Sequence, residues 1–195
     1  RGATNGRNNL WVQGPANSNA PGGNPPNIYY YDETDDTDFT ISGTDASWTM
    51  VPDAAESIGN PQGTGSVTSG LSGLGHGFLI FAFSDENNDG TGEGFPKVLQ
   101  ADGEPRFDLS FNFPVTNTEN ASTTAGDEGW NFLGNPYPTN IEWKTLTRSN
   151  VKDVFYIFDP SSGNYTEGTS STGEDFIAPF QGFFVEADGN SPSLS

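Results

Sequence analysis

Aromatic residues gathered in short, dense runs constrain the fold of this chain more than any other feature. The runs read IYYYD, GFLIFAF, FDLSFNF, DVFYIFD and GFFV, in a chain that also carries 25 glycines and 14 prolines. Disordered chains are poor in aromatics, whereas short apolar runs bounded by turn residues are typical of strands. No segment longer than about ten residues keeps a helical apolar period. The sequence therefore predicts an all-β fold with little helix.

The apolar patterns predict different kinds of strand. Residues 107–113 alternate apolar and polar side chains, which is typical of a strand with one buried and one exposed face. Residues 78–83 and 154–158 are apolar throughout, which favours central strands covered on both faces. Residues 140–150 form the one helical candidate, of one or two turns.

Three sequence elements recur in the same order along the chain. The pairs are LWVQGP (10–15) with WNFLGNP (130–136), NIYYYDETDDTDF (from Asn27) with DVFYIFDPSSGNY (from Asp153), and GHGFLIFA (75–82) with FQGFFVEA (180–187), at offsets of 120, 127 and 105 residues. Each motif is too small to bury its own aromatic face, so we expect the two to close around a shared core. This weak internal pseudo-repeat predicts one jelly-roll-like β-sandwich module over residues 1–195. Its halves are 9–103 and 129–188, bridged by 104–128.

Charge and composition exclude several partners. The net charge is −19 with only seven Lys plus Arg, so a phosphate backbone would be repelled and nucleic acid is excluded. No apolar run approaches the roughly 20 residues of a membrane-spanning helix, so no membrane insertion is expected. The chain has no cysteine and therefore neither disulfides nor thiolate chemistry. Gly/Asn/Ser-rich stretches at both ends indicate an excerpt from a longer polypeptide.

An acidic loop at residues 85–93 is the sharpest candidate for a metal site. DENNDGTGE places oxygen ligands at loop positions 1, 3, 5 and 9 and a glycine at position 6, which suits calcium. The candidate ligands are Asp85, Asn87, Asp89 and Glu93. Position 12 is Pro96 instead of a bidentate Glu, which excludes an EF-hand. A structural Ca²⁺ in a β-hairpin loop and a plain acidic turn remain the two interpretations.

Catalytic constellations are not evident. His76 is the single histidine, no G-x-S-x-G elbow is present, and no carboxylate pair stands out among 26 acidic residues. We therefore expect no enzyme. Aromatic rings that stack on sugar faces are the remaining binding chemistry, and the candidates are Tyr30, Trp48, Tyr137 and Trp143. For each of them, packing in the core is the alternative.

The segment from Gly129 to Ala187 carries a family resemblance. It reads GWNFLGNPYP, then NIEW, an aromatic strand into DPSSGNY, and finally IAPFQGFFVEA. This resembles the module near the C-terminus of many secreted Bacteroidota proteins, ahead of the sorting domain read by the type IX secretion system. The likeness is weaker over Leu10–Asp102. It implies an extracellular or cell-surface location in a multidomain protein, a β-sandwich accessory role and no catalytic residues; the sorting domain itself is not in this sequence.

Three functional classes follow from these features. The first is a non-catalytic accessory module for adhesion or display that binds a polysaccharide or cell-surface glycan. The second is a structural subunit that assembles with copies of itself into a filament or surface layer by strand addition. The third is a fragment of a polysaccharide-degrading enzyme, which would require convergent carboxylates in a cleft.

Overall fold

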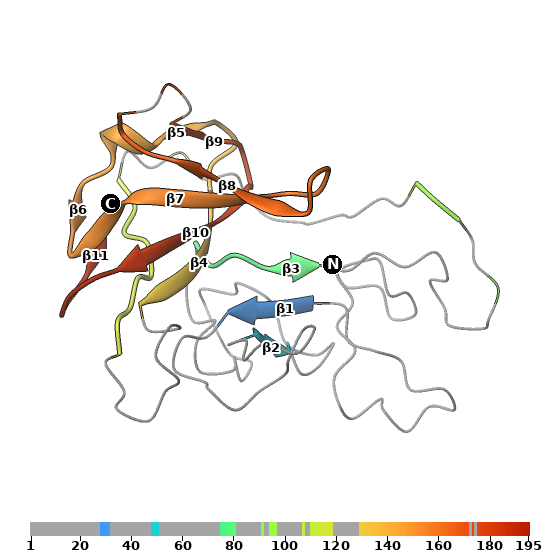
Figure 1. The fold of residues 1–195 in the computed structure, drawn as a ribbon, viewed down its shortest axis with the longest axis horizontal. Helices are drawn as coiled ribbons and strands as arrows, with labels where there is room; N and C mark the ends of the chain where they lie inside the picture. Colours follow the sequence, from blue (N-terminus) through green and yellow to red (C-terminus); the bar gives the residue numbers. More distant parts are fainter. Residues whose placement is uncertain are drawn as a thin grey trace. The chain divides into compact units, whose positions relative to one another are not determined.

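The computed structural model describes residues 28–31, 48–50, 75–80, 91, 94–96, 107, 110–118, 129–171, 173 and 175–195. Over these residues the chain is built of short antiparallel strands, so the predicted all-β class is confirmed (Figure 1). The strands are β1 (Ile28–Tyr31), β2 (Trp48–Met50), β3 (Leu79–Ile80), β4 (Trp130–Gly134), β5 (Ile141–Glu142), β6 (Arg148–Ser149), β7 (Val151–Asp159), β8 (Asn164–Gly168), β9 (Phe176–Ile177), β10 (Gly182–Ala187) and β11 (Ser193–Leu194).

The chain divides into two compact units that interleave along the sequence. The first contains Arg1–Tyr30, Met50–Ser72 and Leu79–Glu104; the second contains Tyr31–Thr49, Gly73–Phe78 and Pro105–Ser195. These boundaries differ from those of the predicted halves, 9–103 and 129–188. The residues that carry the functional argument below all belong to the second unit.

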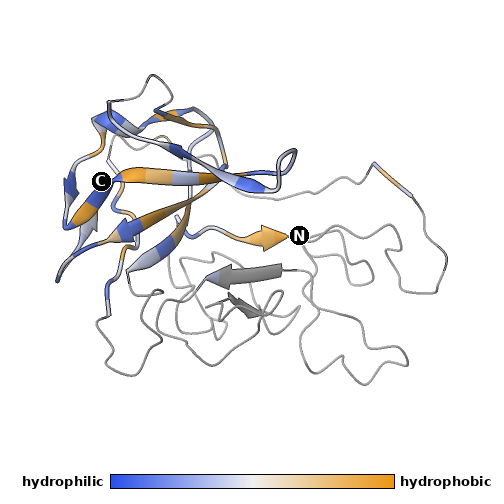
Figure 2. Cartoon of the chain, viewed as in Figure 1, coloured by the Kyte–Doolittle hydropathy of each residue, from blue (hydrophilic) through white to orange (hydrophobic). Residues whose placement is uncertain are grey.

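A four-stranded sheet in the order β4-β10-β7-β8 is the centre of the second unit. β10 pairs antiparallel with both β4 and β7, and β7 pairs antiparallel with β8. The predicted central position of residues 154–158 is therefore confirmed by β7, although Phe158 at its far end is exposed. β7 is rich in apolar residues and β8 is hydrophilic, as Figure 2 shows.

A three-stranded sheet has the order β2-β1-β3. The apolar run at 78–83 was expected to be covered on both faces. In the structure β3 stands at one edge of this order, and Phe78, Leu79 and Ile80 are only half-buried. Residues 81–83 lie outside the described residues.

The pairing of β1 with β3 repeats the pairing of β7 with β10. The sequence offsets of 127 and 105 residues map the partners of the first pair onto those of the second. The equivalent partners are Ile28 with Ile80 and Phe155 with Val185, then Tyr29 with Leu79 and Tyr156 with Phe184. The internal pseudo-repeat predicts this agreement in register. If one strand of a pair were shifted by one residue, each of its side chains would lie on the opposite face of the sheet. The first element, 10–15, lies outside the described residues.

One face of the four-stranded sheet carries the core. Leu133, Phe155, Phe183 and Val185 point into it, and Trp143, the largest fully buried side chain, packs against Phe155 with ring centroids 5.3 Å apart. Burying an apolar side chain of this size stabilises a fold by about 1.5–3 kcal/mol. This core therefore fixes the elements that surround it, including the 3-10 turn η2 (Trp143–Thr145).

A cluster of rings covers the opposite face and centres on Phe184. The Phe184 ring lies 4.6 Å from that of Phe132, 5.7 Å from that of Tyr165 and 5.2 Å from that of Tyr31. The contacts with Tyr165 and Tyr31 are edge-to-face, and such pairs stabilise packing beyond simple burial. Tyr31, the last residue of β1, belongs to the second unit together with the sheet.

Two glycines, one on either side of β4, lie against the ring of Phe132. Gly77 and Gly182 occupy equivalent positions in the repeated GHGFLIFA and FQGFFVEA elements. A Cβ on either would lie 2.6 Å from the Phe132 ring. The Gly77 N–H donates to the Phe132 carbonyl at 2.9 Å, so Gly77 lies beside β4 on the edge that β10 leaves open. Glycine at these positions is therefore a packing requirement.

The segment expected to be the clearest strand is not regular. Within its described part, residues 107 and 110–113, no strand is assigned, and Phe107 is 76% exposed although the alternation placed it on the buried face. Alternation does hold from Phe111 to Val115, where Phe113 and Val115 are buried and Asn112 is exposed. The Phe113 N–H donates to the Leu194 carbonyl at 2.9 Å, but Pro114 has no N–H to continue a ladder.

The predicted helix over 140–150 is wrong in extent. The segment contains β5, the single turn η2 and β6 instead. Glu142 precedes η2 and makes no side-chain cap. β5 pairs with β9 and β6 pairs with β11, so backbone partners distant in sequence override the local helical preference.

Candidate functional site

A groove of about 670 Å³ is the candidate binding site of the second unit. It lies between the irregular segment around Phe111, the corner that follows β4, and the turns on either side of β5. The lining residues are Phe107, Ser110, Phe111, Phe113, Tyr137, Pro138, Thr139, Asn140, Ile141, Glu142, Thr145, Leu146, Thr147 and Ser195. Aromatic rings and uncharged hydroxyl and amide groups dominate this wall.

Three aromatic side chains in contact form one apolar wall of the groove. Phe111 makes edge-to-face contacts with Phe113, at 4.8 Å between ring centroids, and with Tyr137, at 6.4 Å. Phe113 is buried and anchors the set to the core through Phe183, 5.8 Å away. Phe111 and Tyr137 are half-buried. Together with the exposed Phe107, they offer flat apolar surface to a ligand in the groove.

Asn135 fixes the corner that presents Tyr137. Its side chain is only 2% exposed, and its Nδ2 donates to the carbonyls of Thr139 (2.9 Å), Ala178 (2.9 Å) and Ile177 (3.2 Å). Its Oδ1 accepts the Tyr137 N–H at 2.9 Å. Pro136 and Pro138 fix φ on either side of Tyr137. The NPYP corner is therefore rigid and tied to the strand that precedes β10.

Asn131 performs a similar function for the segment that carries Phe111 and Phe113. Its Oδ1 accepts the Thr116 N–H at 2.9 Å, and its Nδ2 donates to the Thr116 carbonyl at 2.8 Å. The side chain thus supplies the two bonds that a neighbouring strand would supply. It continues the attachment of this segment beyond Pro114, where the backbone cannot donate.

An ion-pair cluster forms the polar rim beside β5. Lys144 Nζ lies 2.6 Å from Glu142 Oε1 and 3.1 Å from Oδ2 of the buried Asp175. Hydrogen bonds to Glu142 and Asp175 raise the pKa of Lys144 above its ordinary value. Among the described residues that line the groove, Glu142 is the one acidic side chain, and Lys144 compensates its charge.

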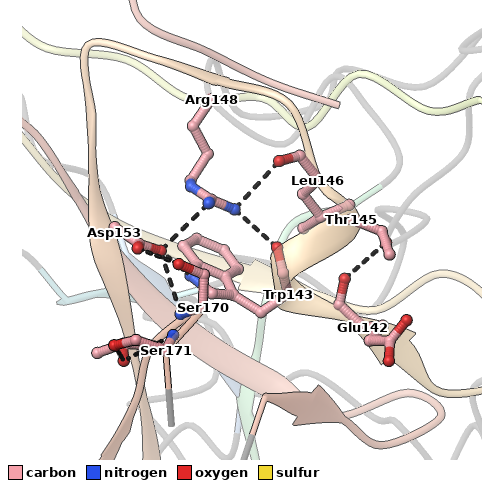
Figure 3. A network of polar contacts seen from close by, with 9 residues as sticks. Glu142, Trp143, Thr145, Leu146, Arg148, Asp153, Ser170 and Ser171 are labelled. Atoms are coloured by element: carbon pink, nitrogen blue, oxygen red, sulfur yellow. Dashed lines mark hydrogen bonds and ion pairs between the residues drawn. The ribbon is translucent and has the colours of Figure 1, made fainter.

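A second polar network holds η2 against β7 (Figure 3). The Trp143 Nε1–H donates to Asp153 Oδ1 at 2.9 Å, and Arg148 lies 3.2 Å from the same oxygen. Arg148 also donates to the Trp143 carbonyl at 2.7 Å and lies 4.8 Å above the indole ring. Ser170 donates to Asp153 through its hydroxyl and its backbone N–H. This network fixes the turn from which Thr145 and Leu146 reach the groove.

The same network makes stability depend on pH. Desolvation alone would raise the pKa of Asp153, but hydrogen bonds from Ser170 and Trp143 outweigh it, so the pKa lies below its ordinary value. Its contribution is therefore present above the unfolded pKa of about 3.9 and is lost as the pH falls through the folded pKa. The Asp153 side chain is 48% exposed, so solvent screening keeps that contribution small.

Replacing Asp153 with asparagine tests this network. We expect Asp153→Asn to lower the free energy of unfolding by about 1 kcal/mol or less at pH 7, because the charge on Arg148 loses its partner. The difference from the wild type should shrink as the pH is lowered from 7 toward 2, because the wild-type carboxyl takes up a proton as the pH falls through its folded pKa. Urea unfolding at both pH values measures it. A difference that stays constant across this range would contradict the assignment.

The predicted ligand-binding residues have different positions in the structure. Tyr137 lines the groove. Trp143 is fully buried, which corresponds to the core-packing alternative, and its ring meets no solvent. Tyr30 lies in β1 and Trp48 in β2, but their side chains lie outside the described residues.

The metal-site prediction is untested. Asp85, Asn87, Asp89 and Glu93 all lie outside the described residues. In the part of the chain that the structure describes, no three His, Cys, Asp or Glu side chains gather in a cluster able to hold a metal ion. Melting with and without a chelator would test the calcium prediction.

Sequence reasoning missed Phe107 and Phe111 as groove residues. It also missed Asn131, which holds the segment of Phe111, and Asn135, which holds the corner that presents Tyr137. Phe107 and Phe111 belong to an alternating pattern that predicted burial alone. The signal for Asn135 was its place in the rigid GNPYP corner. For Asn131, between two aromatic residues in WNF, no sequence signal separated a buried amide from an exposed one.

Comparisons with known proteins do not extend these observations. A scan against protein-family models gave no match, and neither the curated proteins nor the solved structures contain a significant match to the chain. Over the described residues, no helix has the length and apolarity that crossing a membrane requires.

Proposed function

We propose that this chain is a non-catalytic accessory module of an exported, multidomain bacterial surface protein, and that it binds an uncharged polysaccharide in the groove. The observation that carries this proposal is the combination of Phe107, Phe111 and Tyr137 with a lining rich in hydroxyl and amide groups. Flat rings match the apolar faces of sugars, and hydroxyl and amide groups match their hydroxyls. The export and surface location rest on the GWNFLGNPYP resemblance.

Charge favours a neutral ligand over an acidic one. The chain carries −19 at pH 7, and Glu142, the one acidic side chain among the described lining residues, is already paired with Lys144. A uronate-containing or sulfated polysaccharide would approach against this field, and no guanidinium lies among the described residues that line the groove. A neutral glycan incurs no such penalty.

Binding to soluble neutral glucans, mannans and galactans tests the proposal. We expect Phe107→Ala and Tyr137→Ala each to weaken binding of the recognised polysaccharide about tenfold, which corresponds to the loss of one central aromatic contact. Isothermal titration calorimetry measures the affinities. Phe176→Ala is the matched control, because Phe176 is also an exposed phenylalanine but does not line the groove. Equal loss in the control, or no binding by the wild type, would contradict the proposal.

A second candidate function, self-assembly by strand addition, is favoured by β8. Within the described sheet, β8 is the last strand in the order, and its residues Asn164–Glu167 are exposed. An exposed strand edge is a template for a strand of another chain. Sedimentation velocity and electron microscopy distinguish the candidates, since filaments would indicate assembly and monomers with glycan affinity would indicate the accessory module.

A further inference from the structure

Phe180 stands in a backbone conformation that a phenylalanine seldom adopts. It has φ of 58°, in the left-handed region, and its side chain is 70% exposed. The Gln181 N–H donates to the Ala178 carbonyl at 3.1 Å, so residues 178–181 form a β-turn. Pro179 occupies the second position and Phe180 the third, as in a type II turn, where the third residue is ordinarily glycine or asparagine.

The surroundings of the turn hold this strained conformation in place. The Ala178 carbonyl accepts a second hydrogen bond from Asn135 Nδ2 at 2.9 Å, and the Asn135 N–H donates to the Gln181 carbonyl at 3.0 Å. Both ends of the turn are thus tied to one buried residue. Strained backbone persists where neighbouring structure determines it, and it concentrates at ligand-contacting sites. An exposed ring gains nothing from core packing that would offset the strain.

Asn135 also places this turn next to the groove. The same Nδ2 that bonds Ala178 bonds the carbonyl of Thr139, and Thr139 lines the groove with Tyr137 and Pro138. The turn and the NPYP corner therefore meet at one end of the sheet, where β4 ends and β10 begins. Phe180 itself does not line the groove.

We propose that Phe180 is a second, pre-organised stacking platform for the polysaccharide, outside the groove, which contacts sugar units that extend past the NPYP corner. The proposal rests on the proposed function of the groove. A ring held by a rigid turn binds with little loss of conformational entropy, which is the property of strong aromatic contacts in interfaces. The net charge of −19 again selects an uncharged chain as the partner.

Two substitutions separate the ring from the backbone strain. Phe180→Ala removes the ring and keeps a Cβ in the left-handed conformation, whereas Phe180→Gly removes both. We expect each variant to bind the recognised neutral polysaccharide about tenfold more weakly. Only Phe180→Gly should raise Tm, by about 2 °C, because glycine adopts this conformation without strain. Phe180→Trp should keep the affinity.

The length of the ligand completes the test. The disaccharide of the same polysaccharide should bind the wild type, Phe180→Ala and Phe180→Gly equally, because it occupies only the groove and does not reach residue 180. If Phe107→Ala and Tyr137→Ala lose binding while Phe180→Ala does not, the proposal for Phe180 is wrong and the proposal for the groove is retained. If the wild type binds no neutral polysaccharide, both proposals fail. A lower Tm for Phe180→Gly would assign the ring to packing and overturn the inference. Loss of self-association in Phe180→Ala, with glycan affinity unchanged, would assign the ring to a protein partner and would also overturn it.

Discussion

Replacing Gly129 with alanine is expected to lower the free energy of unfolding by more than about 3 kcal/mol, which places it among the largest single-residue effects. Gly129 has φ of 78°, and a Cβ there would lie 2.1 Å from the carbonyl oxygen of Ala187. The obstacle is backbone, and an alanine Cβ has no rotamer that avoids it. The Gly129 carbonyl also accepts the Ala187 N–H at 2.7 Å and Asn131 Nδ2 at 2.9 Å, so any shift disturbs those bonds.

Gly163 provides the matched control for this prediction. Its φ of 71° is close to that of Gly129, but no atom lies within 4 Å of its ideal Cβ. Gly163→Ala should therefore show only the conformational cost of a left-handed residue, about 1–2 kcal/mol. Urea unfolding followed by tryptophan fluorescence measures both variants. Equal losses would mean that close packing against β10 contributes nothing at Gly129.

The strand content and one central strand could be predicted because they depend on local pattern. Residues 154–158 are apolar throughout, and β7 does lie between two other strands. Residues 78–83 show the same pattern, yet among the described strands β3 stands at a sheet edge. Periodicity reports which side chains avoid water, but the number of neighbours on each side of a strand depends on chain topology.

The alternation of apolar and polar residues predicted burial correctly for part of the groove wall but wrongly at Phe107. From Phe111 to Val115 the buried and exposed positions follow the sequence pattern. Phe107 breaks it, because its ring is 76% exposed where the alternation predicts burial, and no strand is formed at residue 107 or over 110–113. The exposed ring of Phe107 is therefore a result of tertiary structure.

Buried amides and strained turns were beyond sequence reasoning for a different reason. The partners of Asn135 include the carbonyls of Ile177 and Ala178, more than 40 residues away. A buried polar group is tolerated because those acceptors are brought to it. Phe180 carries no glycine or asparagine signal for a left-handed position, so the turn there is set by Asn135 and Pro179 together.

Asn135 is the residue whose loss should most affect the candidate site while leaving the strands intact. Asn135→Ala removes the donor to the carbonyls of Thr139 and Ile177 and the acceptor of the Tyr137 N–H. Buried polar groups left without partners cost about 1–3 kcal/mol each, so we expect a loss of about 3 kcal/mol in the free energy of unfolding. The NPYP corner should loosen, and affinity for the polysaccharide should fall with it.

Asn135→Asp gives the sharper test because the shape is nearly unchanged and only the donor is replaced. A carboxylate at this position would face the three carbonyl oxygens that Nδ2 now serves, in a site that is 2% exposed for asparagine. Burial beside these dipoles raises the pKa of the new carboxyl, because its charged form is disfavoured. The variant should therefore be least destabilised below about pH 4, and the loss should grow as the pH rises above the unfolded pKa of about 3.9. Urea unfolding of Asn135→Asp and Asn135→Ala from pH 3 to pH 8 measures this, with the alanine variant as the uncharged reference. A pH-independent difference between the two variants would show that Asn135 Nδ2 does not face these carbonyls.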